Sequence, residues 1–209
     1  MRLGLTKDEL RQLAPLTTPA KIQDFLDALP MNWEKRGETH YSPRVALRKR
    51  KAHCIEGALI AAAALWLHGE KPLIMDMRSR RPDVDHVVAL YKRGGAWGAI
   101  SKTNHATIRF RDPVYRTLRE LALSYFHEWF RNDTGEKTLF SYSRPLNLAR
   151  LGDHWITTEK PLWELDALLD ALPHYPLVPE GNRRFIRSAD PMELRAGRFI
   201  EWKRSDPRT

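Results

Sequence analysis

Residues 85–101 have the sequence DHVVALYKRGGAWGAIS, and this stretch decides the fold. Residues 84–91 are predicted to form a strand, with an apolar run from Val87 to Tyr91. Gly94 and Gly95 follow it, and paired glycines accept the positive φ angles of a tight hairpin turn. A second apolar run covers residues 96–100. We therefore expect an antiparallel β-hairpin.

The register of this hairpin decides which polar side chain faces His86. Counting outward from a two-residue turn at the glycines places Thr103 opposite His86, with Ser101 on the same face because side chains alternate along a strand. A turn one residue longer would place Asn104 opposite His86 instead. Ser101 and Asn104 are thus alternative partners that can accept a hydrogen bond from the imidazole and select its tautomer.

A second pattern lies upstream, over residues 53–69, which read HCIEGALIAAAALWLHG. The alanine-rich run favours a helix, and Gly69 suits the position just after its last turn. The segment is apolar nearly all round, so the helix must be buried on most sides. With a strand expected over residues 72–77, the chain predicts an α+β fold in which a central buried helix packs on a small antiparallel sheet.

Capping signals predict helices that flank this core. A capping box at Thr6 begins a helix that Pro15 ends, and Thr18 begins a second one that Pro30 ends. Asp112 followed by proline predicts a long helix through residue 129. A further helix is expected over residues 160–172, residues 31–50 are expected to form a loop, residues 131–158 an irregular segment with short strands near 139–142 and Trp155, and the tail from Tyr175 has no clear period.

Length and composition set the organisation. The chain has 209 residues, which suits one domain that buries about 70% of its unfolded surface. We expect a single domain over 1–209, with its core over about 52–130. Residues 1–30 form a helical N-terminal appendage in this interpretation, and residues 131–209 form a C-terminal extension packed on the core.

The cysteine count and the apolar runs bear on location. The single cysteine excludes an internal disulfide, which fits a reducing compartment, so we expect a cytoplasmic protein. The N-terminus lacks the apolar stretch of a signal peptide. The longest apolar run, residues 58–67, is shorter than the roughly 20 residues that cross a bilayer, so no membrane association is expected.

The formal net charge of +9 raises the question of an anionic partner. A basic surface attracts nucleic acid, anionic membranes or acidic substrates. The basic residues are dispersed, however, and none of the sequence motifs of nucleic-acid-binding folds is present. Association with nucleic acid is therefore kept only as a weaker alternative.

Cys54 is the first candidate for chemistry. A thiol becomes a good nucleophile when a helix N-terminus and a nearby imidazolium lower its pKa, and Cys54 lies in the first turn of the buried helix. Among the eight histidines, His86 stands out because a strand holds it. His53 adjoins Cys54 and is expected to point elsewhere on the helix. Position alone leaves three others open, namely His105, His127 and His154.

The order of these segments resembles the core of the transglutaminase-like superfamily, a relative of the papain-type cysteine peptidases. The resemblance runs over about Ala52 to Thr103, a quarter of the chain. It implies that Cys54 is the nucleophile and His86 the general base. It also implies that Trp97 corresponds to the tryptophan that precedes the third catalytic residue and walls the cleft.

The third position departs from the family. Ser101 stands where the family has aspartate, and a serine accepts a hydrogen bond but carries no charge to balance an imidazolium. Asn104 is the alternative third member and a candidate contact for substrate. Position 48 is arginine, whereas papain-type enzymes place an oxyanion-binding glutamine there. The backbone amide of Cys54 supplies one oxyanion donor, and a second is not identified.

The function expected from the resemblance is acyl chemistry through a thioester on Cys54, with a peptide or protein amide as the substrate. Peptidase, amidase and transglutaminase outcomes are all left open. The rival hypothesis is a binding module that keeps the fold without the chemistry, and Ser101 motivates it. We expect no metal and no cofactor, since CxxC or HxxxH ligand spacing and a phosphate-binding loop are absent from the sequence.

Overall fold

The computed structural model describes residues 3–208 and contains a seven-stranded sheet. All strand pairs are antiparallel, in the order β4-β3-β2-β1-β5-β7, with β6 paired to the other end of β1. The expected α+β class with an antiparallel sheet is therefore confirmed. The strands are β1 (Leu73–Ser79), β2 (His86–Arg93), β3 (Ala96–Ile100), β4 (Arg111–Tyr115), β5 (Leu139–Ser143), β6 (Leu146–Asn147) and β7 (His174–Pro176).

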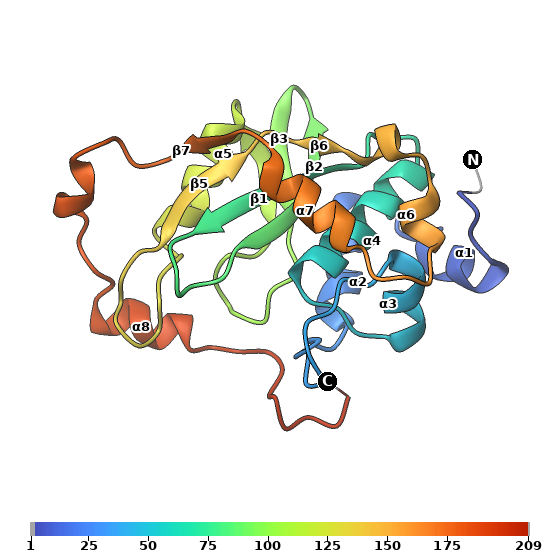
Figure 1. Cartoon of the computed structure of the whole chain (residues 1–209), viewed down its shortest axis with the longest axis horizontal. Helices are drawn as coiled ribbons and strands as arrows, with labels where there is room; N and C mark the ends of the chain where they lie inside the picture. Colours follow the sequence, from blue (N-terminus) through green and yellow to red (C-terminus); the bar gives the residue numbers. More distant parts are fainter. Residues whose placement is uncertain (1–2, 209) are drawn as a thin grey trace.

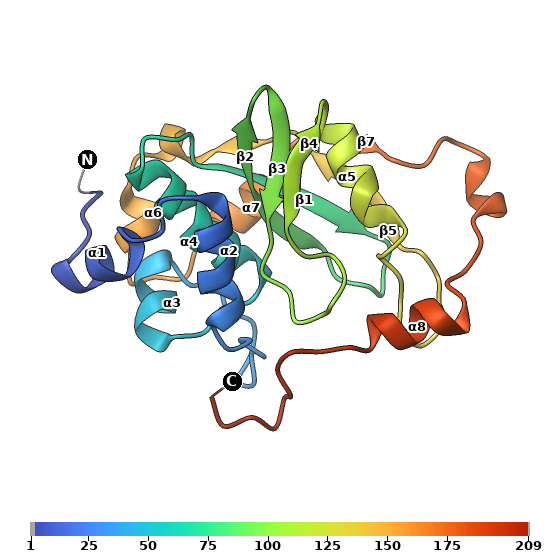
Figure 2. The same cartoon turned by 180° about the vertical axis from the view of Figure 1, so that it is seen from behind.

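Helices lie on both faces of this sheet (Figures 1 and 2). The central one, α4, packs on β1 and β2 and is surrounded by α2, α3 and α6, whereas α5 lies against the opposite face. The helices are α1 (Lys7–Leu13), α2 (Pro19–Ala28), α3 (Pro43–Lys49), α4 (Cys54–Leu67), α5 (Leu118–Phe126), α6 (His154–Thr157), α7 (Trp163–Ala171) and α8 (Pro191–Gly197), with 3₁₀ turns η1 (Leu148–Leu151) and η2 (Asn182–Phe185).

The alternation of side chains along β2 divides the core in two. Val87, Ala89 and Tyr91 belong to the cluster around α4, and Val88 and Leu90 belong to the cluster under α5. Neighbouring side chains on β2 therefore pack into opposite layers. Both faces of the strand are buried, so apolar residues occupy it from Val87 to Tyr91.

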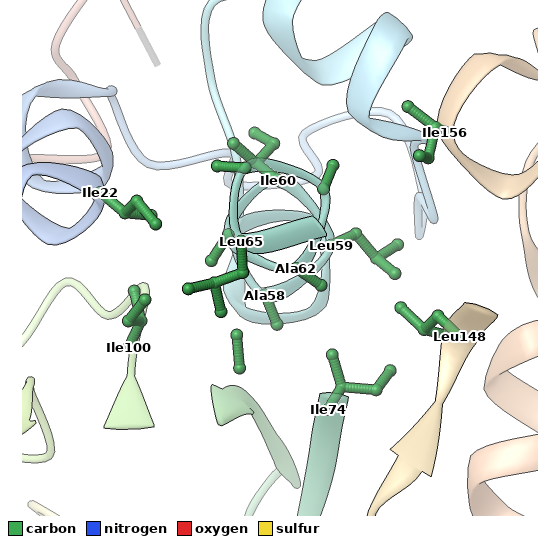
Figure 3. Close-up of a cluster of buried hydrophobic side chains, with 14 of the residues drawn as sticks. Ile22, Ala58, Leu59, Ile60, Ala62, Leu65, Ile74, Ile100, Leu148 and Ile156 are labelled. Atoms are coloured by element: carbon green, nitrogen blue, oxygen red, sulfur yellow. The ribbon is translucent and has the colours of Figure 1, made fainter. Parts of the chain in front are cut away.

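Helix α4 is the centre of the larger cluster, as the sequence predicts. Its residues from Ile55 to Leu65 are all buried. Figure 3 shows side chains from other elements directed at it from several sides. The labelled contributors outside α4 are Ile22 of α2, Ile74 of β1, Ile100 of β3, Leu148 of η1 and Ile156 of α6.

The hairpin has the predicted two-residue turn. Gly94 and Gly95 both have positive φ angles, 54° and 83°, and Ala89 pairs with Ile100 in the register counted from that turn. Pairing ends at Ile100, so Thr103 does not pair with His86 as the simple count implies. Beyond Ile100 the chain leaves the sheet and forms a loop to β4.

The long helix expected after Asp112 is wrong at its start. Arg111–Tyr115 form β4, an edge strand on which Asp112 and Val114 face solvent. Pro113 fits there because an edge strand does not require every amide for pairing. The helix α5 begins only at Leu118, where the Thr117 hydroxyl accepts the amide of Glu120 at 3.1 Å.

The structure differs from the expected elements at several further places, and two of these are helices with capping residues of their own. The loop expected over residues 31–50 contains α3, which Ser42 caps and a proline follows. Asp190 and the next proline begin α8 in the same way, within the tail for which the sequence shows no period. Trp155 lies in α6 and not in a strand, and the helix expected over residues 160–172 is confined to α7. Within the described residues no helix is long and apolar enough to cross a membrane.

Candidate functional site

A cleft of about 430 Å³ opens at the N-terminus of α4. Cys54 and His86 both line it, so the fold brings together two residues that are 32 positions apart in the sequence. The remaining walls come from the segments around residues 31–34, 102–108 and 128–132. This is the arrangement expected of a ligand site, a concave mixture of apolar walls and a few polar groups.

Cys54 is the first residue of α4, and the residue as a whole is partly exposed. The first turn of α4 lies against the loop that follows β3, because Gly57 has no side chain. A Cβ atom at Gly57 would lie 2.3 Å from the Cβ of Lys102. This glycine therefore permits the close approach that brings Ser101 and its neighbours beside the thiol-bearing turn.

Ser101 is the partner of His86. The Nε2 atom of His86 lies 2.8 Å from the Ser101 hydroxyl, and that hydroxyl donates to the carbonyl of Ile108 at 2.8 Å. A hydroxyl has one proton to donate, so towards His86 it accepts. The neutral imidazole is thus protonated on Nε2, which leaves Nδ1 as the basic nitrogen. The sequence predicted Ser101 as this partner, with Asn104 as the alternative.

Asn104 is engaged elsewhere. Its side chain donates to the carbonyl of Trp202 at 3.0 Å and accepts the amide of Trp202 at 2.8 Å. Asn104 lines the cleft, but both ends of its amide hold the C-terminal segment. It does not contact His86 in the manner expected of a third triad member.

Trp97 lies outside the cleft, contrary to expectation. It pairs with Tyr115 on the edge strand, and the Lys92 ammonium lies 4.9 Å from its ring centre. The aromatic side chains that do line the cleft are Trp33, Trp129 and Phe130. The ring of Trp129 meets His86 edge-on, with 5.7 Å between ring centres.

His53 faces the thiol, which corrects the expectation that it points away. Its Nδ1 atom lies 3.9 Å from Sγ of Cys54. His53 is the N-cap of α4 and has an extended backbone, with φ −101° and ψ −169°. The rule that adjacent helical side chains diverge therefore does not apply to this pair.

Glu56 lies behind His53 and is fully buried. Its carboxylate accepts the His53 amide at 3.0 Å and lies 3.3 Å from Nε2 of the ring. The same carboxylate accepts hydrogen bonds from Asn32, Thr39 and the amide of Tyr41. Glu56 lies three residues after the N-cap His53, which is the spacing of a capping box.

The two imidazoles control the ionisation of the thiol. Burial by itself would raise the pKa of Cys54, but hydrogen bonds and charge from His53 and His86 outweigh it and hold the pKa well below its ordinary value. Burial also opposes the charge on His53, yet Cys54 and Glu56 raise its pKa to about 11. The pKa of Glu56 is lowered, because the His53 contacts outweigh the effect of burial.

Trp33 contributes a donor that has no acceptor. Its indole nitrogen is buried and forms no hydrogen bond with the described residues, and the residue lines the same cleft as Cys54. Unsatisfied buried donors are rare, and a functional role is one explanation for them. No sequence pattern pointed to this residue.

A group of three carboxylates, of which Asp85 also lines the cleft, is paired with cationic side chains of the protein. Asp76, Asp85 and Asp170 bring oxygens within 4.8 Å of one another. Arg78 donates to Asp170 at 3.0 Å, and His174 lies 3.0 Å from Asp76. Burial and the charge of Asp85 raise the pKa of Asp76 to about 6 in spite of His174. The charges of these carboxylates are compensated by Arg78 and His174, so we do not assign a metal site to them.

The fold and the cleft define an α+β protein in which one partly exposed cysteine lines a cleft together with two histidines. No family model matches the sequence, and comparison with curated proteins finds no match.

Proposed function

We propose that this chain is a transglutaminase-like cysteine enzyme that transfers the acyl group of a peptide or protein amide through a thioester on Cys54. The observation that carries the proposal is the position of the thiol. Cys54 begins a buried helix, lines a cleft together with His86, and has a pKa held well below its ordinary value. A thiolate in a partly open cleft is the form that attacks carbonyl carbon.

The topology supports the family assignment in the same proposal. The thiol-bearing helix α4 packs on an antiparallel sheet, the histidine begins β2, and its partner Ser101 follows β3. This is the order on which the resemblance to transglutaminase-like proteins rests.

The chemistry proceeds in two balanced steps. The sulfur of Cys54 forms a bond to the amide carbon, the carbonyl π electrons move to oxygen, and Nδ1 of His86 holds the proton that left the thiol. When the C–N bond breaks, this proton passes to the departing amine and the carbonyl re-forms as a thioester. Water or an amine then attacks, gives its proton to His86, and the C–S electron pair returns to sulfur.

The oxyanion of each tetrahedral intermediate needs hydrogen-bond donors. The amide of Cys54 is one of the first-turn amides that have no acceptor within the helix. The unpaired indole N–H of Trp33 in the same cleft is our candidate for the second donor. Donors of this kind stabilise the charge that develops on oxygen.

An activated acyl donor tests the nucleophile without knowledge of the natural substrate. With p-nitrophenyl acetate, we expect a burst of one equivalent of p-nitrophenolate and an acetyl group on Cys54 by intact-mass analysis. Cys54→Ala should show neither. His86→Gln should acylate and then release acetyl about 10²–10⁴-fold more slowly, the range that a general base contributes. The exposed His127 provides the matched control, His127→Gln, with unchanged kinetics.

The acceptor and the rival hypothesis are decided by the same assay. Added hydroxylamine converts the acetyl-enzyme to acetohydroxamate if amines reach the thioester, and free acetate alone indicates hydrolysis. Acetyl groups found only on lysines, with an unmodified Cys54, would contradict the proposal and favour a binding module without acyl chemistry.

A further inference from the structure

We propose that His53 and Glu56 form a permanent ion pair that holds Cys54 as the thiolate. His86 alone then accepts the thiol proton and passes it on during acyl transfer. The carboxylate that the family places behind the strand histidine thus acts, in this protein, behind the neighbouring N-cap histidine. This division of roles rests on the proposed thiol chemistry, but its test does not require a substrate.

The hydrogen bonds of His53 determine where its protons lie. Its Nε2 atom is 2.7 Å from the carbonyl oxygen of Thr39 and 3.3 Å from the carboxylate of Glu56. Both partners only accept, so Nε2 carries a proton in every state of the ring. A second proton on Nδ1 then points to the sulfur atom of Cys54, 3.9 Å away.

Glu56 is the anion that balances this imidazolium. It is fully buried, and its oxygens accept hydrogen bonds from Asn32, Thr39 and the amides of Tyr41 and His53. Each of these donors favours the charged carboxylate over the neutral acid. A buried carboxylate so surrounded stays ionised, and His53 is the nearest group that can carry the opposite charge.

Within residues 3–208 no carboxylate is paired with His86 as Glu56 is paired with His53. The Nε2 atom of His86 meets the neutral hydroxyl of Ser101, whose own proton is directed to Ile108. Ser101 therefore orients the ring through Nε2 and leaves Nδ1 as the nitrogen that can exchange a proton with the thiol. With the thiol proton on His86, the four groups balance as two pairs, Glu56 with His53 and Cys54 with His86.

Other charged groups face these pairs from the surrounding elements. Glu34 lies 3.6 Å from Nε2 of His53, and His40 meets the His53 ring edge-on with 6.1 Å between ring centres. Further titratable or charged residues line the cleft, namely Asp83, Asp85, Lys102, His105, Glu128 and Arg131. The test therefore compares variants that leave all of these groups in place.

Alkylation by iodoacetamide across a pH series measures the ionisation of the thiol directly. The chain has one cysteine, so every alkylated product reports on Cys54. We expect the wild type to react well below pH 8.5, the ordinary thiol value. His53→Gln should raise the midpoint by about one pH unit or more, a tenfold loss of rate below it. His86→Gln should raise the midpoint by less.

The matched control is His68→Gln, the same substitution at the exposed opposite end of α4, and its profile should coincide with that of the wild type. Glu56→Gln should shift the midpoint in the direction of His53→Gln. Since Glu56 is buried, a thermal melt followed by circular dichroism accompanies each variant, and His53→Gln decides the question if Glu56→Gln fails to fold.

A shift in His86→Gln equal to or larger than that in His53→Gln would overturn the assignment. The acyl function is judged separately. One outcome is that the alkylation midpoint depends on His53 while p-nitrophenyl acetate fails to acylate Cys54. That combination would support the ion pair and reject the proposed enzyme function. Acylation of Cys54 together with an alkylation pH profile that His53→Gln leaves unchanged would support the enzyme function and reject the ion pair.

Discussion

The side-chain amide of Gln23 in α2 forms two hydrogen bonds with the backbone of Ser101. Its Oε1 atom accepts the Ser101 amide at 2.9 Å, and its Nε2 atom donates to the Ser101 carbonyl at 2.8 Å. Both residues are buried. A helix outside the hairpin thus sets the position of the hydroxyl that orients His86.

Gln23→Leu should weaken the site through this contact. Two buried backbone groups lose their partners, at about 1–3 kcal/mol each, so the free energy of unfolding in urea should fall. Acyl transfer from p-nitrophenyl acetate should slow further than stability explains, because Ser101 moves away from His86. Asp24→Asn, an exposed neighbour on α2, should change neither measurement. Normal acyl transfer in a destabilised Gln23→Leu protein would show that Gln23 only supports the fold.

Ser101→Ala separates orientation of His86 from activation of the thiol. We expect acyl transfer to fall by about 10–100-fold, part of the 10²–10⁴ that a general base contributes, since the His86 tautomer is no longer selected. The pH profile of alkylation should stay in place, because His53 still faces the sulfur atom. Ser143→Ala removes another buried hydroxyl of the sheet and should affect stability alone. A shifted alkylation midpoint in Ser101→Ala would contradict this separation.

Trp33→Phe removes the unpaired indole N–H but keeps an aromatic ring in the cleft. If this donor binds the oxyanion, acyl transfer should fall by about 10²–10³, the usual loss for one such donor, while alkylation is unchanged. Trp155 supplies the control because its indole nitrogen is also buried and unpaired among the described residues, yet it lies in the core. Equal effects of Trp33→Phe and Trp155→Phe would reject the role.

Lys102 should make stability depend on pH. Its ammonium donates to the carbonyl of Leu26 at 2.8 Å, near the end of α2, and burial lowers its pKa from 10.5 to about 8. Between about pH 8 and 10.5 the unfolded chain binds this proton more tightly than the folded one. The free energy of unfolding should therefore rise with pH across this range, by up to about 1.4 kcal/mol per pH unit, and stay level below it.

In Lys102→Met the free energy of unfolding should not rise with pH in this way. The wild type should therefore gain stability relative to the variant as the pH increases above about 8. Urea unfolding at several pH values provides the measurement. The exposed Lys71 gives the control, Lys71→Met, whose profile should run parallel to that of the wild type. Parallel profiles for Lys102→Met would show that the buried ammonium does not titrate in this range.

The elements that the sequence predicts best have strong local signals. The glycine pair fixes the turn between β2 and β3, and the alanine-rich run specifies α4, without help from distant residues. The hairpin in turn brings Ser101 to His86. The start of the predicted long helix failed for a reason of topology, since Pro113 fits an edge strand as well as a first helical turn, and only the sheet order distinguishes them.

The part of the site that the sequence does not predict depends on backbone geometry. His53 and Cys54 would diverge if both were helical, but the extended N-cap turns the His53 ring back towards the sulfur atom. The donor at Trp33 has no local signal at all, because a loop far from the hairpin carries it into the cleft. Glu56 does have a local signal, because its spacing from residue 53 is that of the capping box that Thr6 and Glu9 form at the start of α1.

The bonds between Asn104 and Trp202 bear on how the protein is made. Figure 2 shows the C-terminal segment running from α8 along the loop that follows β3, and Gly197 lines the cleft. Cys54, His86 and Ser101 leave the ribosome long before the residues that brace this loop. Domains generally fold as units during synthesis, and the thiol is translated well before Gly197, which forms part of the cleft wall. A nascent chain would thus carry the nucleophile before Gly197 reaches the cleft and before the backbone of Trp202 holds Asn104 in place.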